Sequence, residues 1–316
     1  TRHKAVAIDS KTRYAAGMTD TQFVPKMAFA GAKLDYAEDR RDITSLRKFL
    51  KDPNARAVLM IDGKPAVRED GGLKTVHPDA LVGKSIFAPG VIFLGIDKIG
   101  PVFAYMLDGA QGLADEEAFQ EMRFIASRLD SKSLAIAGRA KSLFDWHGSH
   151  RFCSACGKES QPVSGGMNRK CPFCQTEHYP RVNPVAIMLV LNGDDCLLGR
   201  SAGWPDGAFS ALAGFVSPGE TLEEGCAREV KEEVGLNVTG MRYVFSQPWP
   251  FPSQLMMGMI CHTDERELTI NTDELETAKW FSKDTVRDVF AKKSDAFLRP
   301  PSFTIAHQLL RYWLAE

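Results

Sequence analysis

Short runs of hydrophobic residues, separated by polar turn residues, fill the chain from residue 57 to residue 108. The stretch AVLMIDGKPAV predicts a β-hairpin around Asp62-Gly63, because such a pair suits a two-residue turn between strands. The stretch GVIFLGIDKIGPVFAYML predicts two more strands. From residue 115 to residue 147 apolar residues recur at helical spacing, which predicts helices that cover the sheet. Residues 1–148 are therefore expected to form a mixed α+β domain.

A strand pattern returns in the C-terminal part of the chain. The stretch VAIMLVLNGDDCLLGR predicts two strands joined at Asn192-Gly193. A closing helix is predicted over residues 302–315, with Ser302 as its N-cap. Between the two halves the composition changes to Cys, Gly, Ser and Pro, which predicts a separate unit over residues 149–182 and a C-terminal domain over residues 183–316. Further strands are predicted at Met241–Ser246, Leu255–His262 and Ala278–Phe281.

The charge composition limits the kinds of partner. The 316 residues include 39 Lys and Arg and 40 Asp and Glu, so no global basic field attracts nucleic acid or membranes. An anionic ligand must be held by a local site. No apolar run of about 18 residues predicts a membrane span, and the first residues lack a secretory pattern, so a cytoplasmic protein is expected. The mixed charges from Glu38 to Asp42 predict a solvated helix or loop.

The seven cysteines fall into two groups. Cys196, Cys226 and Cys261 lie singly among apolar residues and are expected to be buried. The other four form two Cys-x-x-Cys pairs separated by 14 residues, which is the spacing of two knuckles that share one tetrahedral Zn²⁺. Four protein ligands leave no position for water, so one structural zinc ion per chain is predicted. Its ligands would be Cys153, Cys156, Cys171 and Cys174.

The segment GFVSPGETLEEGCAREVKEEVGL, residues 214–236, predicts a turn followed by an amphipathic helix rich in carboxylates. At 3.6 residues per turn, Glu229 and Glu233 stand one above the other, and Glu232 lies on the adjoining edge. Such like charges repel unless a cation neutralises them, and Mg²⁺ or Mn²⁺ binds carboxylate oxygens and bridges phosphates. Arg228 is expected to pair with Glu224 or to reach back to Glu220.

The spacing of these residues resembles the Nudix box, G-x5-E-x7-R-E-U-x-E-E-x-G-U, where U is aliphatic. The resemblance implies a Nudix hydrolase whose C-terminal domain is an α/β/α sandwich, in an α/β chain that also has a zinc ribbon and the mixed α+β N-terminal domain. The matching positions are Gly214, Glu220, Arg228, Glu229, Val230, Glu232, Glu233, Gly235 and Leu236.

A second motif, SQPWPFPSQLM from Ser246 to Met256, follows the box. Its three prolines predict a stiff loop that cannot continue a strand and that displays Trp249 and Phe251 for stacking on a nucleobase. Packing inside the protein is the alternative role of these aromatics. The stretch resembles the S-Q-P-W-P-F-P-x-S motif of the NADH pyrophosphatase subfamily, which also removes NAD caps from RNA. One position departs from that motif, because Gln254 replaces its final serine.

The subfamily resemblance implies a homodimer with two or three Mg²⁺ or Mn²⁺ ions in each active site. Glu229, Glu233, Glu274 and the backbone carbonyl of Ala213 would hold the metals, and Glu232 is a further candidate. Catalytic roles fall to the four glutamates, and Gly214, Glu220 and Arg228 shape the motif. The resemblance places nicotinamide against Phe215, with Tyr179 reaching in from the partner chain. The predicted substrate-binding residues are Tyr179, Ala213, Phe215, Gln247, Trp249 and Phe251.

The predicted activity is hydrolysis of the pyrophosphate bond of NADH or NAD⁺ to nicotinamide mononucleotide and AMP, and NAD-capped RNA is a further candidate substrate. Within the same class, ADP-ribose, FAD or another nucleoside diphosphate derivative is an alternative substrate. From a different class, the chain could be a zinc-ribbon protein that binds nucleic acid on a Nudix scaffold. The intact acidic box argues against a scaffold, because three repelling carboxylates on one helix face would serve no purpose there.

Overall fold

The structure is a computed structural model that describes residues 25–81, 90–109 and 112–316. The N-terminal sheet has the strand order β2-β1-β5-β4, with β3 also paired to β1, and only the β1–β5 pair is parallel. The predicted hairpin is present, since Ile61 opposes Lys64 across a turn in which Asp62 and Gly63 have φ angles of 48° and 78°. The strands are β1 (Arg56–Ile61), β2 (Lys64–Pro65), β3 (Thr75–Val76), β4 (Val91–Ile96) and β5 (Pro101–Met106).

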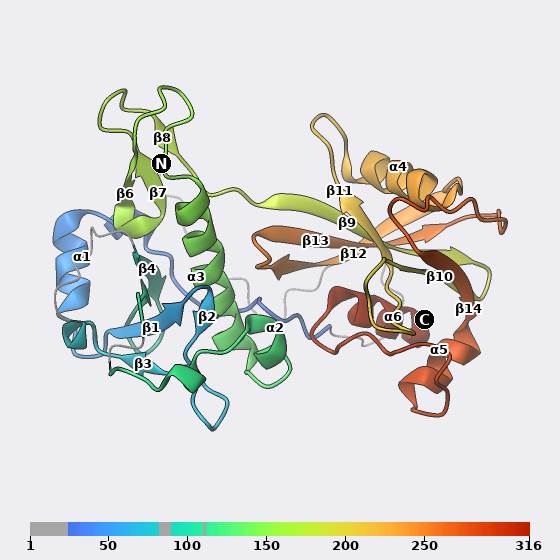
Figure 1. The fold of residues 1–316 in the computed structure, drawn as a ribbon, viewed down its shortest axis with the longest axis horizontal. Helices are drawn as coiled ribbons and strands as arrows, with labels where there is room; N and C mark the ends of the chain where they lie inside the picture. The colour runs from blue at the N-terminus through green and yellow to red at the C-terminus, as the bar shows by residue number, and fades with distance from the viewer. Residues whose placement is uncertain (1–24, 82–89, 110–111) are drawn as a thin grey trace.

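Helices cover both faces of this sheet (Figure 1). Alternate residues of β1 divide between the two cores: Val58 and Met60 pack with helices α2 (Met122–Ile125) and α3 (Ser131–Ser149), whereas Ala57 and Leu59 pack with α1 (Ile43–Leu50). The region from residue 115 to residue 147, predicted to be helical, contains two separate helices, because a turn before Asp130 separates α2 from α3. Single 3-10 turns lie at η1 (Glu38–Arg40), η2 (Pro78–Ala80) and η3 (Glu116–Ala118).

The charge run at residues 38–42 is only partly solvated, contrary to the prediction. Asp42 caps α1 by accepting hydrogen bonds from the backbone N–H groups of Thr44 and Ser45. Arg41 is buried and donates to the carbonyl oxygens of Phe93, Tyr36 and Ser164. Those three acceptors belong to different segments, so this arginine joins the sheet to the following small unit.

The cysteine-rich unit is a three-stranded antiparallel sheet of β6 (Gln161–Val163), β7 (Asn168–Lys170) and β8 (Glu177–His178). It rests on the N-terminal sheet through η4 (Ser164–Gly166), where Gly166 has a φ of 83°. A Cβ atom at Gly166 would lie 3.0 Å from Ile92 Cγ1, so a side chain there would push the unit off strand β4.

The C-terminal domain is a three-layer sandwich, as predicted. Its sheet has the order β12-β13-β9-β10-β14, with β11 paired to β9. On β9, Ala186, Met188 and Val190 face helix α4, whereas Ile187, Leu189 and Leu191 face helices α5 and α6. Figure 1 shows α4 on one side of the sheet and the other two helices on the opposite side. The elements are β9 (Asn183–Asn192), β10 (Asp195–Arg200), β11 (Leu212–Phe215), α4 (Leu222–Val234), β12 (Gly240–Trp249), β13 (Gln254–His262), β14 (Thr277–Ser282), α5 (Lys283–Phe290) and α6 (Ile305–Ala315).

Two local predictions in this domain are wrong. Helix α6 begins at Ile305 rather than near Ser302, because the Thr304 hydroxyl caps it by accepting from the His307 N–H. Strand β12 continues through Pro248 to Trp249, although the prolines were expected to end it. Because β12 lies at the edge of the sheet, a missing backbone N–H on its outer side breaks no ladder. Within the described residues, no helix is long and apolar enough to span a membrane.

Candidate active site

Helix α4 begins and ends at well-formed caps. The Thr221 hydroxyl accepts from the Glu224 N–H at 3.2 Å, and the Glu224 carboxylate accepts from the Thr221 N–H at 2.8 Å. This capping box fixes the point at which the acidic turn becomes a helix. At the other end Gly235, with a φ of 78°, supplies the left-handed residue that stops the helix. The two caps therefore fix where the helix backbone begins and ends, and with it the positions of the glutamates along the helix.

Arg228 connects the turn to the helix. Its guanidinium donates to both carboxylate oxygens of Glu220, at 2.6 and 2.9 Å, and to the backbone oxygen of Phe215 at 2.9 Å. This pairing lowers the pKa of Glu220 to about 2. Of the two expected partners, Glu220 is the one that the structure shows. The same guanidinium also donates to Glu229 at 2.9 Å and to Glu232 at 2.8 Å, so it holds two helix carboxylates as well.

Three carboxylates converge beside the helix. Oxygen atoms of Glu229, Glu233 and Glu274 all lie within 4.8 Å of one another. Glu274 comes from a turn before β14 that is anchored on the end of α4, because the Asn271 N–H donates to the Glu233 carbonyl at 2.9 Å and the Glu274 N–H to the Asn271 carbonyl at 3.2 Å. The sequence singled out Glu274 only through the family resemblance, and it gave no indication of the role of Asn271.

Glu233 is the most constrained member of this group, which we call the carboxylate cluster (Glu229, Glu233 and Glu274). Its side chain is buried, and its Oε2 atom has no hydrogen-bond partner among the described residues. Burial, followed by the negative charges of Glu229 and Glu274, raises the pKa of Glu233 to about 8. A buried carboxylate oxygen without a donor, close to two further carboxylates, is a suitable ligand set for a hard divalent cation.

The structure separates Glu232 from the carboxylate cluster. Its side chain is half exposed, and its carboxylate is paired with Arg228 on the outer edge of the helix. Glu232 therefore shares the acidic helix with Glu229 and Glu233, as the spacing indicates, but its carboxylate is not one of the three that converge. Its predicted catalytic role stays a prediction.

Gly214 lies so close to the Glu229 carboxylate that no side chain would fit at this position. It lies on β11 next to Ala213, and a Cβ atom built on it would fall 1.8 Å from Glu229 Cδ. We expect Gly214→Ala to lower kcat by about 100-fold or more, because displacing a catalytic group by about an ångström has that effect. Gly240→Ala is the matched control, since its new methyl group would meet no atom within 4 Å. Wild-type turnover in the Gly214 variant would show that Glu229 can move without loss.

The raised pKa of Glu233 predicts a pH-dependent stability of the metal-free protein. In the unfolded chain this carboxyl ionises near its ordinary pKa, whereas in the fold it stays protonated until about pH 8. Its contribution to stability is therefore complete below the unfolded pKa and is lost as the pH rises through the folded pKa. We expect urea unfolding in chelator to show this loss between about pH 5 and pH 8, while Glu233→Gln removes that part of the slope. An identical slope in both proteins would contradict the assignment.

The sulfurs of the four predicted zinc ligands come together in the structure. All lie within 4.8 Å of one another, and the Cys153–Cys174 and Cys156–Cys171 pairs are each 3.5 Å apart. Sulfurs bound tetrahedrally to Zn²⁺ at about 2.3 Å would be about 3.8 Å apart, so the geometry fits zinc. The two knuckles have equivalent hydrogen bonds, because the N–H groups of Gly157 and Gln175 donate to the carbonyls of Cys153 and Cys171.

The cysteine-rich unit is also tied to helix α3 by polar contacts that the sequence did not predict. His147 donates through Nε2 to the Gly166 carbonyl at 2.7 Å, and its Nδ1 accepts from buried Arg169 at 3.1 Å. Arg169 can only donate, which fixes this tautomer. Burial lowers the pKa of His147, so the ring is neutral in its contact.

The two aromatic residues expected at the substrate are accessible. Phe215 follows Gly214 on β11 with 53% of its surface exposed, and Tyr179 follows β8 with 64% exposed. The Tyr179 hydroxyl donates to Glu177 Oε2 at 2.7 Å, which orients the ring. Their predicted roles in substrate binding stay predictions.

The proline-rich segment occupies a more buried position than predicted. Gln247 is fully buried and donates through Nε2 to the carbonyls of Phe303 and Ala28, at 2.7 and 3.3 Å. Trp249 and Phe251 pack edge-on against buried Phe29 from the N-terminal part of the chain. Trp249 and Phe251 are therefore only partly exposed, and together with Gln247 they join the two larger domains. Their predicted roles in substrate binding, and that of Gln247, stay predictions.

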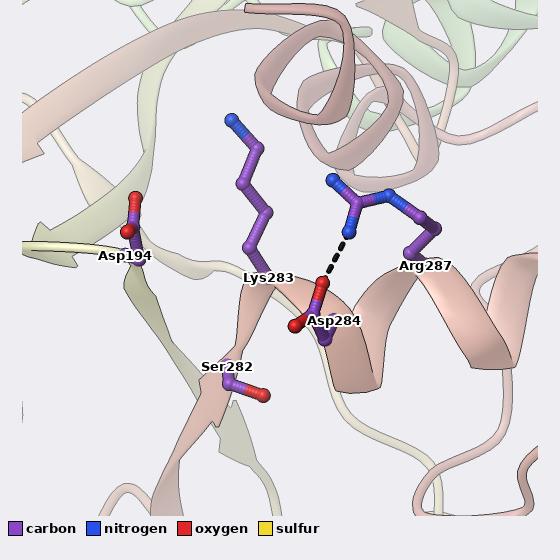
Figure 2. Close-up of a pocket in the computed structure, with 5 residues that line it drawn as sticks. All are labelled: Asp194, Ser282, Lys283, Asp284 and Arg287. Atoms are coloured by element: carbon purple, nitrogen blue, oxygen red, sulfur yellow. Dashed lines mark hydrogen bonds and ion pairs between the residues drawn. The ribbon is translucent and has the colours of Figure 1, made fainter.

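Two hollows lined by described residues lack this convergence of like charges. Figure 2 shows one at the start of α5, lined by Asp194, Ser282, Lys283, Asp284 and Arg287. It mixes both signs of charge, and Arg287 forms an ion pair with Asp284 on the same helix. A second hollow in the N-terminal domain also mixes both signs of charge, including the exposed pair of Arg68 and Asp70. The carboxylate cluster is therefore the better candidate for chemistry.

Three models of protein families match the chain. Residues 181–300 match the NUDIX domain, residues 149–179 match the NADH pyrophosphatase zinc ribbon domain, and residues 54–146 match the NADH pyrophosphatase-like rudimentary NUDIX domain. The last match relates most of the N-terminal domain to the same family.

Curated proteins with similar sequences agree with these matches. The chain is 42% identical to the NAD-capped RNA hydrolase NUDT12 of Homo sapiens over 59% of its own length, and it spans only 43% of that relative. It is 37% identical to the mitochondrial NAD(P)H pyrophosphatase NUDT13 of Homo sapiens, over 71% of this chain and 67% of the relative. It is also 37% identical to the NAD-capped RNA hydrolase NudC of Stutzerimonas stutzeri, over 68% of this chain and 74% of that protein.

Proposed function

The chain belongs to the Nudix hydrolase family, and we propose that it hydrolyses the pyrophosphate bond of NADH or NAD⁺ to nicotinamide mononucleotide and AMP. The observation that carries this proposal is the carboxylate cluster, with a buried glutamate oxygen that no described group satisfies. A divalent cation would relieve both the repulsion and the missing hydrogen bond. The names of the relatives, which mention NAD(P)H and NAD-capped RNA, support the choice of substrate.

We assign metal binding to Glu229, Glu233, Glu274 and the carbonyl oxygen of Ala213. When bound, Mg²⁺ or Mn²⁺ neutralises diphosphate oxygens and lowers the pKa of a coordinated water. Arg228 holds Glu229 in place and, through the Phe215 carbonyl, fixes the strand that carries Gly214. Proton acceptance from the attacking water falls to Glu274 rather than Glu232, because Glu232 is engaged by Arg228 and lies outside the carboxylate cluster.

The reaction transfers one phosphoryl group to water. The water oxygen forms a bond to one phosphorus, the bridging P–O bond breaks, and the leaving phosphate retains the bridging oxygen. Exposed Phe215 offers a flat face for the nicotinamide ring beside the cluster. We propose that a homodimer completes the site with Tyr179 of the second chain, because this residue is exposed and oriented by Glu177. A cytoplasmic location stays a prediction.

Substrate comparison tests the proposed activity. We expect the highest kcat/KM for NADH or NAD⁺ among NADH, NAD⁺, ADP-ribose, FAD and NAD-capped RNA, with activity lost in chelator and restored by Mg²⁺ or Mn²⁺. Preference for ADP-ribose or FAD would keep the chemistry and overturn the substrate. Salt-sensitive RNA binding without hydrolysis of any of the five would instead favour a nucleic-acid-binding protein.

A further inference from the structure

Two exposed phenylalanines lie at the zinc knuckles. Phe152 precedes Cys153 and Phe173 precedes Cys174, and their exposed fractions are 63% and 70%. The sulfurs of Cys153 and Cys174 are 3.5 Å apart, so both phenylalanines belong to the same end of the ribbon. The two rings expose a large apolar area to water. The zinc site does not need these rings, because the four sulfurs alone bind the metal.

Each of these rings has a cation beside it. The Arg151 guanidinium lies 6.0 Å from the centre of the Phe152 ring, and Lys158 Nζ lies 5.9 Å from the centre of the Phe173 ring. Arg151 also forms an exposed ion pair with Glu159, which contributes little to stability. We call these four residues (Arg151, Phe152, Lys158 and Phe173) the knuckle face. It combines flat apolar surfaces with positive charge, whereas an ordinary protein interface has few charges at its centre.

We infer that the knuckle face binds the single-stranded RNA chain of an NAD-capped substrate. Unpaired bases stack on exposed aromatic rings without regard to sequence, and neighbouring cations bind the phosphates between them. The local charge agrees with such a partner, since residues 149–182 contain five Lys and Arg against two Asp and Glu, although the whole chain is balanced. The loop between the knuckles lacks aromatics, so the sequence alone did not indicate this surface.

The polypeptide leads from the cysteine-rich unit straight into the strand that pairs with β11 beside the carboxylate cluster. Exposed Tyr179 and Arg181 follow β8 and lead directly into β9. On that strand Val185 is the Cα partner of Phe215, the exposed aromatic beside Gly214. Figure 1 shows the tip of the cysteine-rich unit, beyond β8, and helix α4 on the same long side of the molecule. An RNA whose first nucleotide is the cap could therefore run from the cluster toward the ribbon. This inference rests on the proposed function only in assuming that the RNA carries an NAD cap. Binding of RNA to the knuckle face can be tested without catalysis.

The direct test measures binding of a fluorescent, uncapped, single-stranded RNA by anisotropy. We expect the double variant Phe152→Ala/Phe173→Ala to bind it at least about tenfold more weakly than the wild type, because loss of even one base stack weakens binding by about that factor. Phe124→Ala is the matched control, since Phe124 is 77% exposed in the N-terminal domain. It should leave RNA affinity unchanged. Lys158→Gln should reduce the slope of log Kd against log salt concentration.

Enzymatic assays separate this inference from the proposed function. The double variant should keep the wild-type kcat/KM on NADH and its zinc, while its kcat/KM on NAD-capped RNA falls by about tenfold. Unchanged RNA affinity in the double variant would overturn the inference, whatever the activity on NADH. A change in oligomeric state measured by light scattering would also overturn it, because a second copy of the chain would then cover the face. Failure of the wild type to hydrolyse NADH would instead contradict the proposed function.

Discussion

Replacing Glu233 with glutamine is expected to lower kcat on NADH by at least about 1,000-fold while the protein stays folded and keeps its zinc. Glutamine has the same shape but cannot supply the charged oxygen that a divalent cation requires, and metal ions stabilise such transition states by several kcal/mol. In the metal-free wild type at pH 7 this buried carboxyl must stay protonated, within 4.8 Å of two other carboxylates, and that protonation costs folding free energy. Glutamine has no such cost, so the metal-free variant should be at least as stable as the wild type. Steady-state kinetics, calorimetry of Mn²⁺ binding and thermal unfolding measure these effects.

Glu232→Gln is the matched control for this variant. It changes the neighbouring residue on the same helix, but its carboxylate is half exposed and paired with Arg228. We expect a far smaller loss of kcat and unchanged affinity for Mn²⁺. Equal losses in the two variants would mean that the whole acidic face acts as a unit, and near-wild-type turnover of Glu233→Gln would refute its role as a metal ligand.

Loss of the zinc ion is expected to unfold the ribbon and destabilise the chain around it. Cys171→Ser removes a buried ligand from a unit of three short strands that has little core of its own. Structural zinc supplies about 10 kcal/mol or more of folding free energy in comparable small units, so the variant should lose the metal and become sensitive to proteases within residues 149–182. Elemental analysis and limited proteolysis followed by mass spectrometry measure both effects.

The control for the zinc experiment is Cys196→Ala. This thiol is also fully buried, but it lies in the core of the C-terminal domain and is not one of the four knuckle cysteines. The substitution should cost about 1 kcal/mol of stability and leave the zinc content unchanged. A Cys171 variant that retains one zinc ion per chain and resists proteolysis would contradict the four-sulfur site.

The periodic parts of the fold were predictable from the sequence. The β9–β10 hairpin was predicted with its turn at Asn192-Gly193, one residue before the turn that the structure has at Gly193-Asp194. Helix α4 follows from the apolar repeat of the acidic segment. Strand β11 was not predicted, since its four residues are too few for a pattern and depend on pairing with β9. Helix α5 was also missed, and its signal was the Ser282 cap followed by the alternation of Val286 and Val289 with charged residues.

The candidate site was predictable only where its residues lie close together in the sequence. Glu229 and Glu233 share a helix turn, so their proximity follows from helix geometry. Glu274 joins them through the Asn271 turn, which is a long-range contact that a sequence pattern cannot specify. Tertiary contacts also explain why the partial burial of the proline-rich segment was not predicted: Phe29 and Phe303 pack against Trp249, and neither is near it in the sequence.

In the proposed reaction, the carboxylate cluster directs metal-dependent attack of water on the pyrophosphate bond. Hydrolysis of NADH in water enriched in ¹⁸O, followed by mass spectrometry of both products, tests it most directly. We predict nicotinamide mononucleotide in its reduced form and AMP, with one ¹⁸O atom on the phosphate of one product, and no reaction in chelator. Release of nicotinamide together with an intact ADP-ribose, or equal rates with and without chelator, would contradict this mechanism.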